Sequence, residues 1–336
     1  MPSPQNNQNA PRSSRSLFSL TILIVWLVLL GWAFINRQAI FDWWKLRGYD
    51  PPAEVSALAT QTTMNDQARK MFYVNQPLIL HKQNFTKYCP NSGGEKTIVL
   101  GCYHPTQNGI YVLAVDDARL NGVEQVTSAH EMLHAAYDRL SGSDKQKVDK
   151  LLTDYYQNEL ADERVKKIID AYKQSEPNDV VNEMHSIFGT ELRDLPPALE
   201  TYYARYFTNR QAVAAYASKY QGEFTSRQNA IEQYDAQLET YKNQINSLES
   251  QLQGQKLQID SEQQRLANLR AENNIAAYNS GVPGYNQLVR DYNANVAVLR
   301  VLVVKYNNLV NQRNAVAFEV DQLSKELSTN KSTINN

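Results

Sequence analysis

The sequence predicts a mostly helical protein with a small β-sheet, in which an α+β domain lies between one N-terminal transmembrane helix and a C-terminal antiparallel coiled-coil hairpin. Three observations predict this fold class. An uncharged apolar run follows a polar tail, short strand-like runs alternate with helical ones in the middle, and apolar residues recur every seven positions near the end. The expected boundaries are 1–16 for a disordered tail, 17–35 for the transmembrane helix, 36–62 for a juxtamembrane linker, 63–218 for the α+β domain and 219–330 for the coiled-coil hairpin.

The composition excludes some classes of function. The 336 residues carry a formal net charge of -1, so neither a basic surplus for nucleic acid nor an acidic tail is present. The length allows one good core with extra elements, or two modest domains. With 20 tyrosines and 13 glycines, the chain suits long amphipathic helices better than an all-β fold.

The apolar run at residues 17–35 reads LFSLTILIVWLVLLGWAFI and predicts a membrane anchor. As a helix these nineteen residues measure about 28 Å, close to the hydrocarbon thickness of a bilayer. No convincing small-x-small cleavage site follows, which favours a retained anchor over a long signal peptide. Trp26 lies mid-span, while an aromatic cluster at one end is typical of a membrane interface; its members are Trp32, Phe41, Trp43 and Trp44.

Basic residues lie on both sides of this run, so their distribution alone does not fix the orientation. The two cysteines, Cys89 and Cys102, are expected to form a disulfide that closes a loop of about a dozen residues; the alternative is a pair of unlinked buried thiols. Because disulfides persist outside the cytoplasm, we expect a single-pass protein of the cell membrane whose body is extracytoplasmic.

The middle region reads as short strands followed by helices. Its expected elements are a helix capped by Thr63 and reaching Phe72, a strand at Leu78–Leu80, a turn at Asn91–Gly94, a hairpin of Thr97–Tyr103 and Gly109–Val115, and helices at Val123–Leu140, from Ser143 to Lys173, from Asn178 or Asp179 to Arg193, and from Pro196-Pro197 onward.

Two heptad patterns predict the coiled-coil hairpin, with a turn at Ser280–Gly284 between them. A single continuous helix that dimerises is the alternative, and the Gly/Pro turn disfavours it. The first pattern contains Ile231, Leu238, Ile245, Leu252, Ile259 and Leu266 with Tyr234, Tyr241, Leu248 and Leu269; the second contains Val289, Val296, Val303, Val310 and Ala317 with Tyr285, Tyr292, Leu299, Tyr306 and Val320.

Residues 130–134 read His-Glu-Met-Leu-His within the expected helix Val123–Leu140. Positions i and i+4 share a helix face, so His130 and His134 can both bind one metal ion. Glu131 lies about 100° around the helix from His130, which suits a base beside the metal rather than a ligand. The alternative to metal binding is that the two histidines lie on a core or solvated face of the helix and have no role in binding.

This helix with the strand before it resembles the zincin metallopeptidases, over about residues 95–195 and sharply only at 130–134. The resemblance implies a single Zn2+, His130 and His134 as ligands, Glu131 as general base, and Gly109–Val115 as the edge strand that pairs with the substrate. Tyr137 and Leu140 stand where the H-E-x-x-H-x-x-G-x-x-H motif of metzincins has glycine and a third histidine, so the sequence disfavours that branch.

The gluzincin branch takes its third ligand from a glutamate on a later helix, and residues 181–186 (Val-Asn-Glu-Met-His-Ser) resemble its N-E-x-x-S motif. Glu183 is therefore the expected third ligand, ahead of Glu191, Asp179 and His185. Ile187 replaces the aspartate that orients a ligating histidine in some of these enzymes, so another acceptor, not evident in the sequence, must do this. Candidates for an oxyanion stabiliser are Tyr203, His185 and Arg205.

Together these features predict a membrane-anchored zinc peptidase that hydrolyses peptide bonds in a peptide or protein substrate. The alternative function is a zinc-binding scaffold or interaction protein without turnover. The tyrosine-rich seam of the coiled coil packs less uniformly than a Leu/Ile seam, which favours a helical protein partner there.

Overall fold

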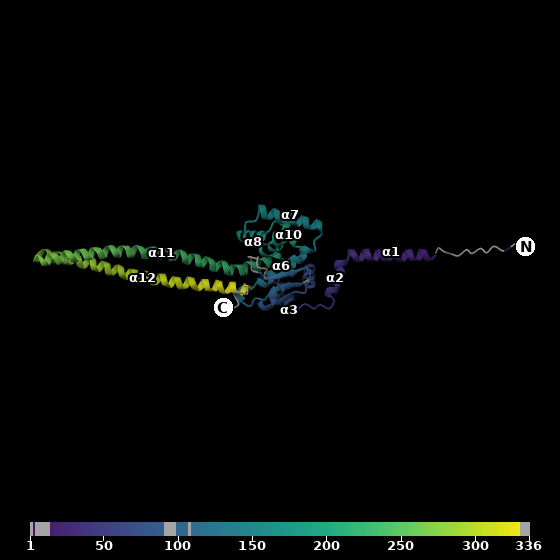
Figure 1. The fold of residues 1–336 in the computed structure, drawn as a ribbon, viewed down its shortest axis with the longest axis horizontal. Coiled ribbons are helices and arrows are strands. Elements are labelled where there is room, and N and C mark those ends of the chain that lie inside the picture. Colours follow the sequence, from purple (N-terminus) through teal and green to yellow (C-terminus); the bar gives the residue numbers. More distant parts are fainter. Residues whose placement is uncertain (1–2, 4–13, 91–98, 107–108, 330–336) are drawn as a thin grey trace. The chain divides into compact units, whose positions relative to one another are not determined.

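The computed structural model describes residues 3, 14–90, 99–106 and 109–329 and is mostly helical, with one three-stranded sheet (Figure 1). The predicted turn Asn91–Gly94 and most of the predicted tail 1–16 lie outside these residues. Two compact units make up the chain: Met1–Ala114 with Glu124–Ala214, and Val115–Val123 with Ala215–Asn336.

The first unit begins with two helices, α1 (Ser14–Ile35) and α2 (Arg37–Leu46), so α1 starts slightly before the predicted Leu17. Within the described residues, no helix taken alone has the length and apolar character needed to cross a bilayer. Ser19–Ile35 and Arg37–Leu46 meet those requirements only as a pair, bent by 69°. The predicted single span is therefore not established by the structure.

Part of the predicted linker 36–62 belongs to the core of the first unit. Helix α3 (Ala53–Gln61) buries Val55 and Ala59 completely, at 0% exposure each. Helix α4 (Asp66–Val74) follows, and its cap is Asn65, whose side chain accepts a hydrogen bond from the Ala68 N–H at 3.0 Å. Thr63 was predicted as this cap, but it has a left-handed φ of 54° and lies before the helix.

The sheet combines the predicted hairpin with a third strand. Strand β1 (Leu78–Leu80) precedes helix α5 (Lys82–Tyr88), and β2 (Gly101–His104) and β3 (Gly109–Leu113) form the antiparallel hairpin. β1 pairs in parallel with β3, which gives the order β1-β3-β2. A disulfide joins Cys89, after α5, to Cys102 in β2, with their Cα atoms 5.9 Å apart.

Five helices follow: α6 (Val123–Asp138), α7 (Gly142–Asn158), α8 (Glu163–Ser175), α9 (Val180–Glu191) and α10 (Pro197–Tyr203). The single helix predicted from Ser143 to Lys173 is in fact two, because Asp162 caps a new helix by accepting from the Val165 N–H at 3.0 Å. Ser141, rather than Ser143, caps α7 through the Asp144 N–H.

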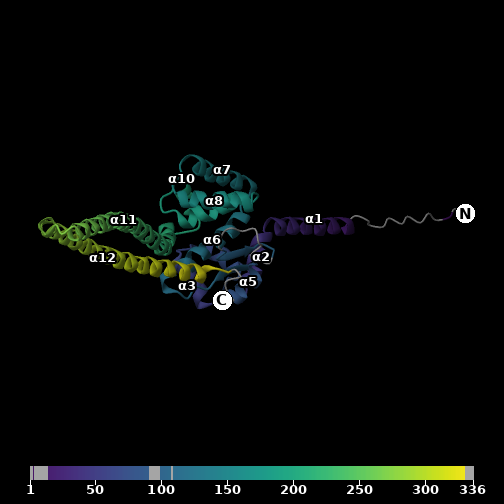
Figure 2. The same cartoon turned by 60° about the vertical axis from the view of Figure 1, so that its left-hand side comes forward.

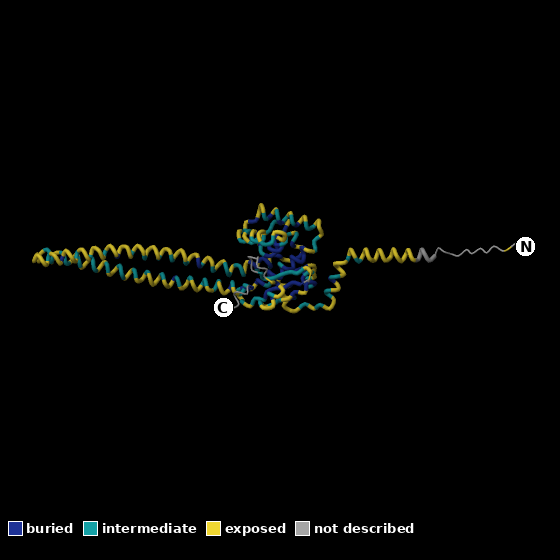
Figure 3. The backbone as a smooth tube through the Cα atoms, in the orientation of Figure 1, coloured by how far each residue is buried: buried dark blue, intermediate teal, exposed yellow. Residues whose placement is uncertain are grey.

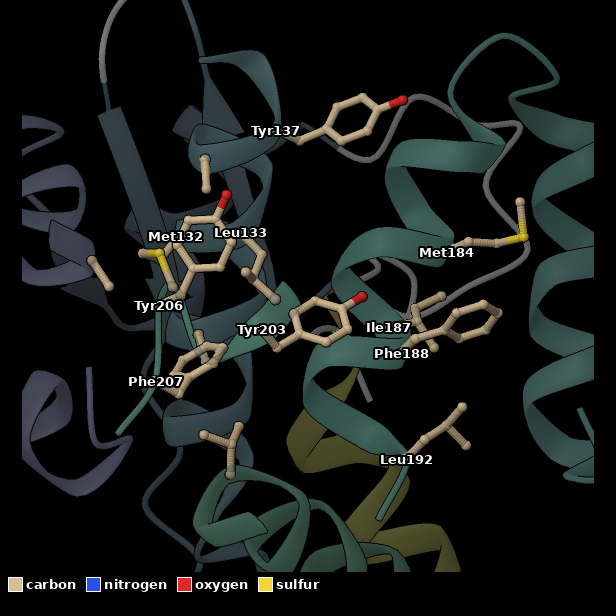
Figure 4. Packing of buried hydrophobic residues seen from close by; sticks show 14 of the residues in the cluster. Met132, Leu133, Tyr137, Met184, Ile187, Phe188, Leu192, Tyr203, Tyr206 and Phe207 are labelled. Atoms are coloured by element: carbon tan, nitrogen blue, oxygen red, sulfur yellow. The ribbon is translucent and has the colours of Figure 1, made fainter. Parts of the chain in front are cut away.

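Much of the core of this unit lies where α6, α9 and α10 meet. Figure 3 marks the buried residues along the backbone, and Figure 4 shows buried side chains of this core packed together. Leu133 from α6, Phe188 from α9 and Tyr203 from α10 are each fully buried at 0% exposure. Gly189 permits this approach, since a Cβ there would lie 2.5 Å from Leu133 Cδ1 and 2.7 Å from Tyr203 Cε1. The close packing of α9 on α6 positions the site described below.

The second unit contains the 3₁₀ turn η1 (Ala118–Leu120) and two long helices, α11 (Arg210–Ala271) and α12 (Ile275–Leu327). The first residues of α11, 210–214, belong to the first unit. The two helices run side by side in Figures 1 and 2. They are antiparallel, because their cross-helix contacts are nested: Arg227 with Glu319 at 2.8 Å, Asp235 with Arg313 at 3.1 Å, and Gln255 with Asn295 at 2.9 Å.

The turn between these helices lies earlier than predicted. Asn273 takes a left-handed φ of 60°, and Asn274 caps α12 by accepting from the Ala277 N–H at 3.2 Å. The predicted turn Ser280–Gly284 is instead part of α12, with Pro283 inside the helix. Gly281 allows the helices to approach, since a Cβ there would lie 2.8 Å from Leu266 Cδ2.

None of the residues in the first heptad pattern is exposed. In α12 the residues of the second heptad pattern are at least partly buried, except Val303, which is 37% exposed. Leu302 and Leu309, which the strict seven-residue repeat misses, lie in less exposed positions on this helix.

Candidate metal centre

Helix α6 brings the two motif histidines together, as its spacing predicts. The His130 and His134 Nε2 atoms lie 3.0 Å apart, and their side chains are 18% and 10% exposed. Apolar neighbours on the same helix, among them Ala129, Met132 and Leu133, are buried in the core and hold α6 in place. One face of a rigid helix therefore presents two imidazole nitrogens to the same point.

Helix α9 supplies a carboxylate to that point. Glu183 Oε1 lies 3.4 Å from His134 Nε2, and Glu183 Oε2 lies 3.6 Å from His130 Nε2. One ligand atom from each of the three residues lies within 4.8 Å of the others. Glu183 Oε2 is buried without a hydrogen-bond partner in the described part of the chain. A buried carboxylate oxygen left unpaired beside two imidazoles fits a group that could hold a metal ion.

Asn182 contacts one of the candidate ligands. Its Oδ1 lies 2.9 Å from His134 Nδ1, and its Nδ2 donates to Asp179 Oδ1 at 3.2 Å, which fixes the direction of the amide. His134 Nδ1 therefore carries the proton and its Nε2 presents a lone pair. Asn182 is therefore the acceptor for the histidine that the sequence analysis could not name. In the sequence, the one feature that points to Asn182 is its position directly before Glu183.

The charge of Glu183 is also favoured. Burial acts to raise the pKa of this carboxyl, but the His134 and His130 imidazoles and a hydrogen bond from Tyr172 outweigh it, so its pKa is lowered. An ionised carboxylate is the form that binds a cation.

Glu131 lies against the sheet rather than among the three ligands. It is 5% exposed, and a Cβ on Gly101 would lie 2.6 Å from Glu131 Oε1 and 2.5 Å from Thr127 Cγ2. Strand β2 thus begins beside the Glu131 carboxylate. The family resemblance implies that Gly109–Val115 is the edge strand, and this prediction is wrong. β3 pairs on both sides and is the central strand, whereas β2 lies at an edge of the sheet formed by the described residues.

Comparisons with protein-family models, curated proteins and solved structures find no match to this chain. The assignment of a candidate metal centre therefore rests on its own side chains, which are two imidazoles and one carboxylate that could hold a metal ion.

Glu191 and Asp179, the other acidic residues considered as a third ligand, contact other side chains. Glu191 accepts a hydrogen bond from Arg164 at 2.6 Å. Asp179 contacts Asn182 and forms an acidic group with Glu176 and Glu183, but neither histidine belongs to that group.

His185 points away from the centre and into the core. It is completely buried, its Nε2 lies 2.9 Å from the Tyr202 hydroxyl, and burial together with the His134 and His130 imidazoles holds its pKa well below the usual value. The Tyr203 hydroxyl donates to the His185 carbonyl at 2.7 Å, and the Arg205 guanidinium lies 5.6 Å from the centre of the Tyr202 ring. All three candidates for an oxyanion stabiliser are thus engaged in packing.

The contact between Asn182 and His134 gives a testable prediction. Asn182→Ala leaves the His134 Nδ1–H without its acceptor and frees the ring to rotate, so zinc affinity should fall about 10- to 100-fold. Titration against a competing chromophoric chelator measures this. Asn178→Ala is the matched control, because Asn178 is exposed in the turn before α9. Equal affinities for the two variants would show that Asn182 does not orient the ligand.

Proposed function

We propose that the chain is a zinc-dependent peptidase in which Glu131 acts as general base. One observation carries the proposal: on the helix that bears Glu131, two imidazole nitrogens face a buried carboxylate oxygen that has no hydrogen-bond partner in the described residues. Two histidines and one glutamate are the donor set of a common class of catalytic zinc site, which leaves a coordination position open. The identity of the metal as zinc, and the hydrolysis of peptides, are parts of the proposal.

Bound zinc would polarise the scissile carbonyl and acidify water at the site. His130, His134 and Glu183 would hold the ion, with the His134 ring oriented by Asn182. The Glu131 carboxylate would accept a proton from the attacking water and pass it to the leaving amine. Because Glu131 is 5% exposed, few water molecules compete for its oxygens.

We further propose that the substrate backbone pairs with β2. This strand lies at the edge of the sheet and begins at Gly101, whose missing side chain admits the Glu131 carboxylate. An extended peptide added to such an edge gains main-chain hydrogen bonds and holds a peptide bond in register. β2 therefore takes the role that the sequence analysis gave to β3.

The membrane anchor and an extracytoplasmic catalytic domain are also proposed. The described part of α1 exposes apolar side chains around its whole surface, from Leu20 at 53% to Ile35 at 81%. A helix that is apolar on every side suits a lipid environment better than water. The Cys89–Cys102 disulfide suits an oxidising compartment. A helical partner at the coiled-coil hairpin stays a prediction.

Zinc content and proteolysis together test the proposal. The full-length protein in detergent should hold about one zinc per chain and cleave a mixed peptide library, and chelation should stop cleavage until zinc is restored. The double variant His130→Ala/His134→Ala should lose both properties. A wild type that binds zinc tightly yet cleaves no peptide would instead support the zinc-binding scaffold.

Gly101 supplies a prediction specific to the base. Gly101→Ala places a methyl group against Glu131 Oε1, and a displacement of about 1 Å in a catalytic group can cost about 100-fold in kcat. Zinc content should not change, because Gly101 faces Glu131 rather than the ligands. The measurement is kcat together with bound zinc. Gly142→Ala is the control, since a Cβ there meets nothing within 4 Å. Unchanged kcat in Gly101→Ala would contradict the placement of Glu131.

A further inference from the structure

Helix α2 has its polarity reversed relative to a helix on the surface of a water-soluble protein. Its outer face exposes Ile40 at 41%, Trp43 at 63% and Trp44 at 64%. Its inner face carries the acid Asp42, which is only 4% exposed. In water, apolar side chains would turn inward and a carboxylate outward, so the medium outside α2 must favour aromatic side chains.

The inner face of α2 is held to the first unit by ion pairs. Asp42 accepts hydrogen bonds from both terminal nitrogens of Arg139, at 3.1 Å each, and lies 3.5 Å from Lys70 Nζ. Arg139 directly follows α6, the helix with the candidate metal ligands. Because the carboxylate is nearly inaccessible and pairs with two cations, α2 cannot turn its outer face inward without leaving a buried charge unpaired.

Basic side chains accompany the aromatic ones on the outer face. Arg37 and Arg47 are both exposed, and the Arg47 guanidinium lies 5.6 Å from the centre of the Trp43 ring. Tryptophan and arginine together are typical of the headgroup level of a bilayer, where the ring is partly apolar and the cation meets phosphate. The charge of this face therefore complements an anionic lipid surface.

The angle between α1 and α2 agrees with that location. The two helices are bent by 69° at Asn36, so if α1 crosses the bilayer, α2 turns away from its path. A short amphipathic helix that follows a span at a steep angle is suited to the interface plane.

We propose that α2 lies in the membrane interface, with Ile40, Trp43 and Trp44 inserted among lipid headgroups and Asp42 fixing the first unit to the bilayer surface. This inference rests on the proposed anchor and not on the peptidase activity. It identifies a second contact with lipid beyond α1, and it limits the distance between the candidate metal centre and the membrane.

Tryptophan fluorescence tests this inference, because the four tryptophans of the chain all lie in α1 and α2. Full-length protein that retains only Trp44 (Trp26→Phe, Trp32→Phe, Trp43→Phe) is reconstituted into phosphatidylcholine–phosphatidylglycerol vesicles with brominated phosphatidylcholine. Bromines placed near the headgroup should quench Trp44 more strongly than bromines placed near the bilayer centre. A matched protein that retains only Trp26 should show the opposite order. Circular dichroism confirms that each variant is folded.

The other outcomes are distinct. Quenching of Trp44 chiefly by deep bromines would make α2 part of the span, which overturns the inference. Quenching of Trp26 without quenching of Trp44 would mean that α2 faces water or a protein partner, and this also overturns it. No quenching of either would remove the anchor and the inference together, while leaving the zinc and cleavage tests unaffected.

Discussion

Glu131→Gln should abolish peptide hydrolysis while the protein keeps its zinc. The substitution retains the size of a side chain that is 5% exposed, so the fold and the three ligands should be preserved. Glutamine cannot accept a proton from water or pass it to the leaving amine. A positioned general base typically raises the reaction rate about 10²- to 10⁴-fold, so we expect kcat to fall by at least about 100-fold.

The measurement combines kcat with zinc content for the same preparation. Glu124→Gln is the matched control, because Glu124 lies on the same helix, two turns before the motif and outside the group of three ligands. Two results would contradict the assignment: a Glu131→Gln protein that still turns over at the rate of wild type, or one that loses its zinc. The second would make Glu131 a ligand rather than a base.

Residue spacing was enough to predict the part of the site that lies on one helix. His130 and His134 are one turn apart, so helical geometry alone brings their nitrogens together. Glu183 was found through the neighbouring residues that resemble a known motif. Asn182 and Gly101 were missed because their roles depend on contacts between distant segments. Asn182 is 48 residues from His134, and Gly101 reaches Glu131 only when the sheet packs on α6.

The errors in the fold have a similar cause. Alternation in the sequence predicts the hairpin of β2 and β3, but it does not show that β1 adds to β3 in parallel, which makes β3 central. Between the long helices α11 and α12, the sequence signal of Pro283 and its neighbouring glycines for a turn is stronger than that of Asn273-Asn274. Yet α12 contains Pro283 beyond its first turn, and asparagine readily takes the left-handed conformation that the observed turn requires.

Glu183→Ala should remove most of the zinc affinity. Changing a residue that only orients a ligand weakens metal binding about 10- to 100-fold, so loss of a ligand itself should weaken it by more than about 100-fold. Glu191→Ala is the control on the same helix, because Glu191 pairs with Arg164 instead of the histidines. Competition against a chelator gives the dissociation constants. Affinities for Glu183→Ala and Glu191→Ala that do not differ would contradict the ligand assignment.

Thermal unfolding separates this loss of affinity from simple damage to the fold. At free zinc about 100 times the wild-type Kd, binding stabilises the folded protein by about 2.7 kcal/mol, and a 100-fold weaker Kd leaves only about 0.4 kcal/mol. Zinc should therefore raise the Tm of wild type and Glu191→Ala but barely change that of Glu183→Ala. Without zinc, Glu183→Ala also removes a carboxylate whose charge is favoured by the His134 and His130 imidazoles and by Tyr172, so the metal-free variant should be less stable than metal-free wild type. A glutamate with only a structural role would also lower the stability without zinc, but it would leave the rise of Tm on adding zinc unchanged, so the response of Tm to zinc decides between the two.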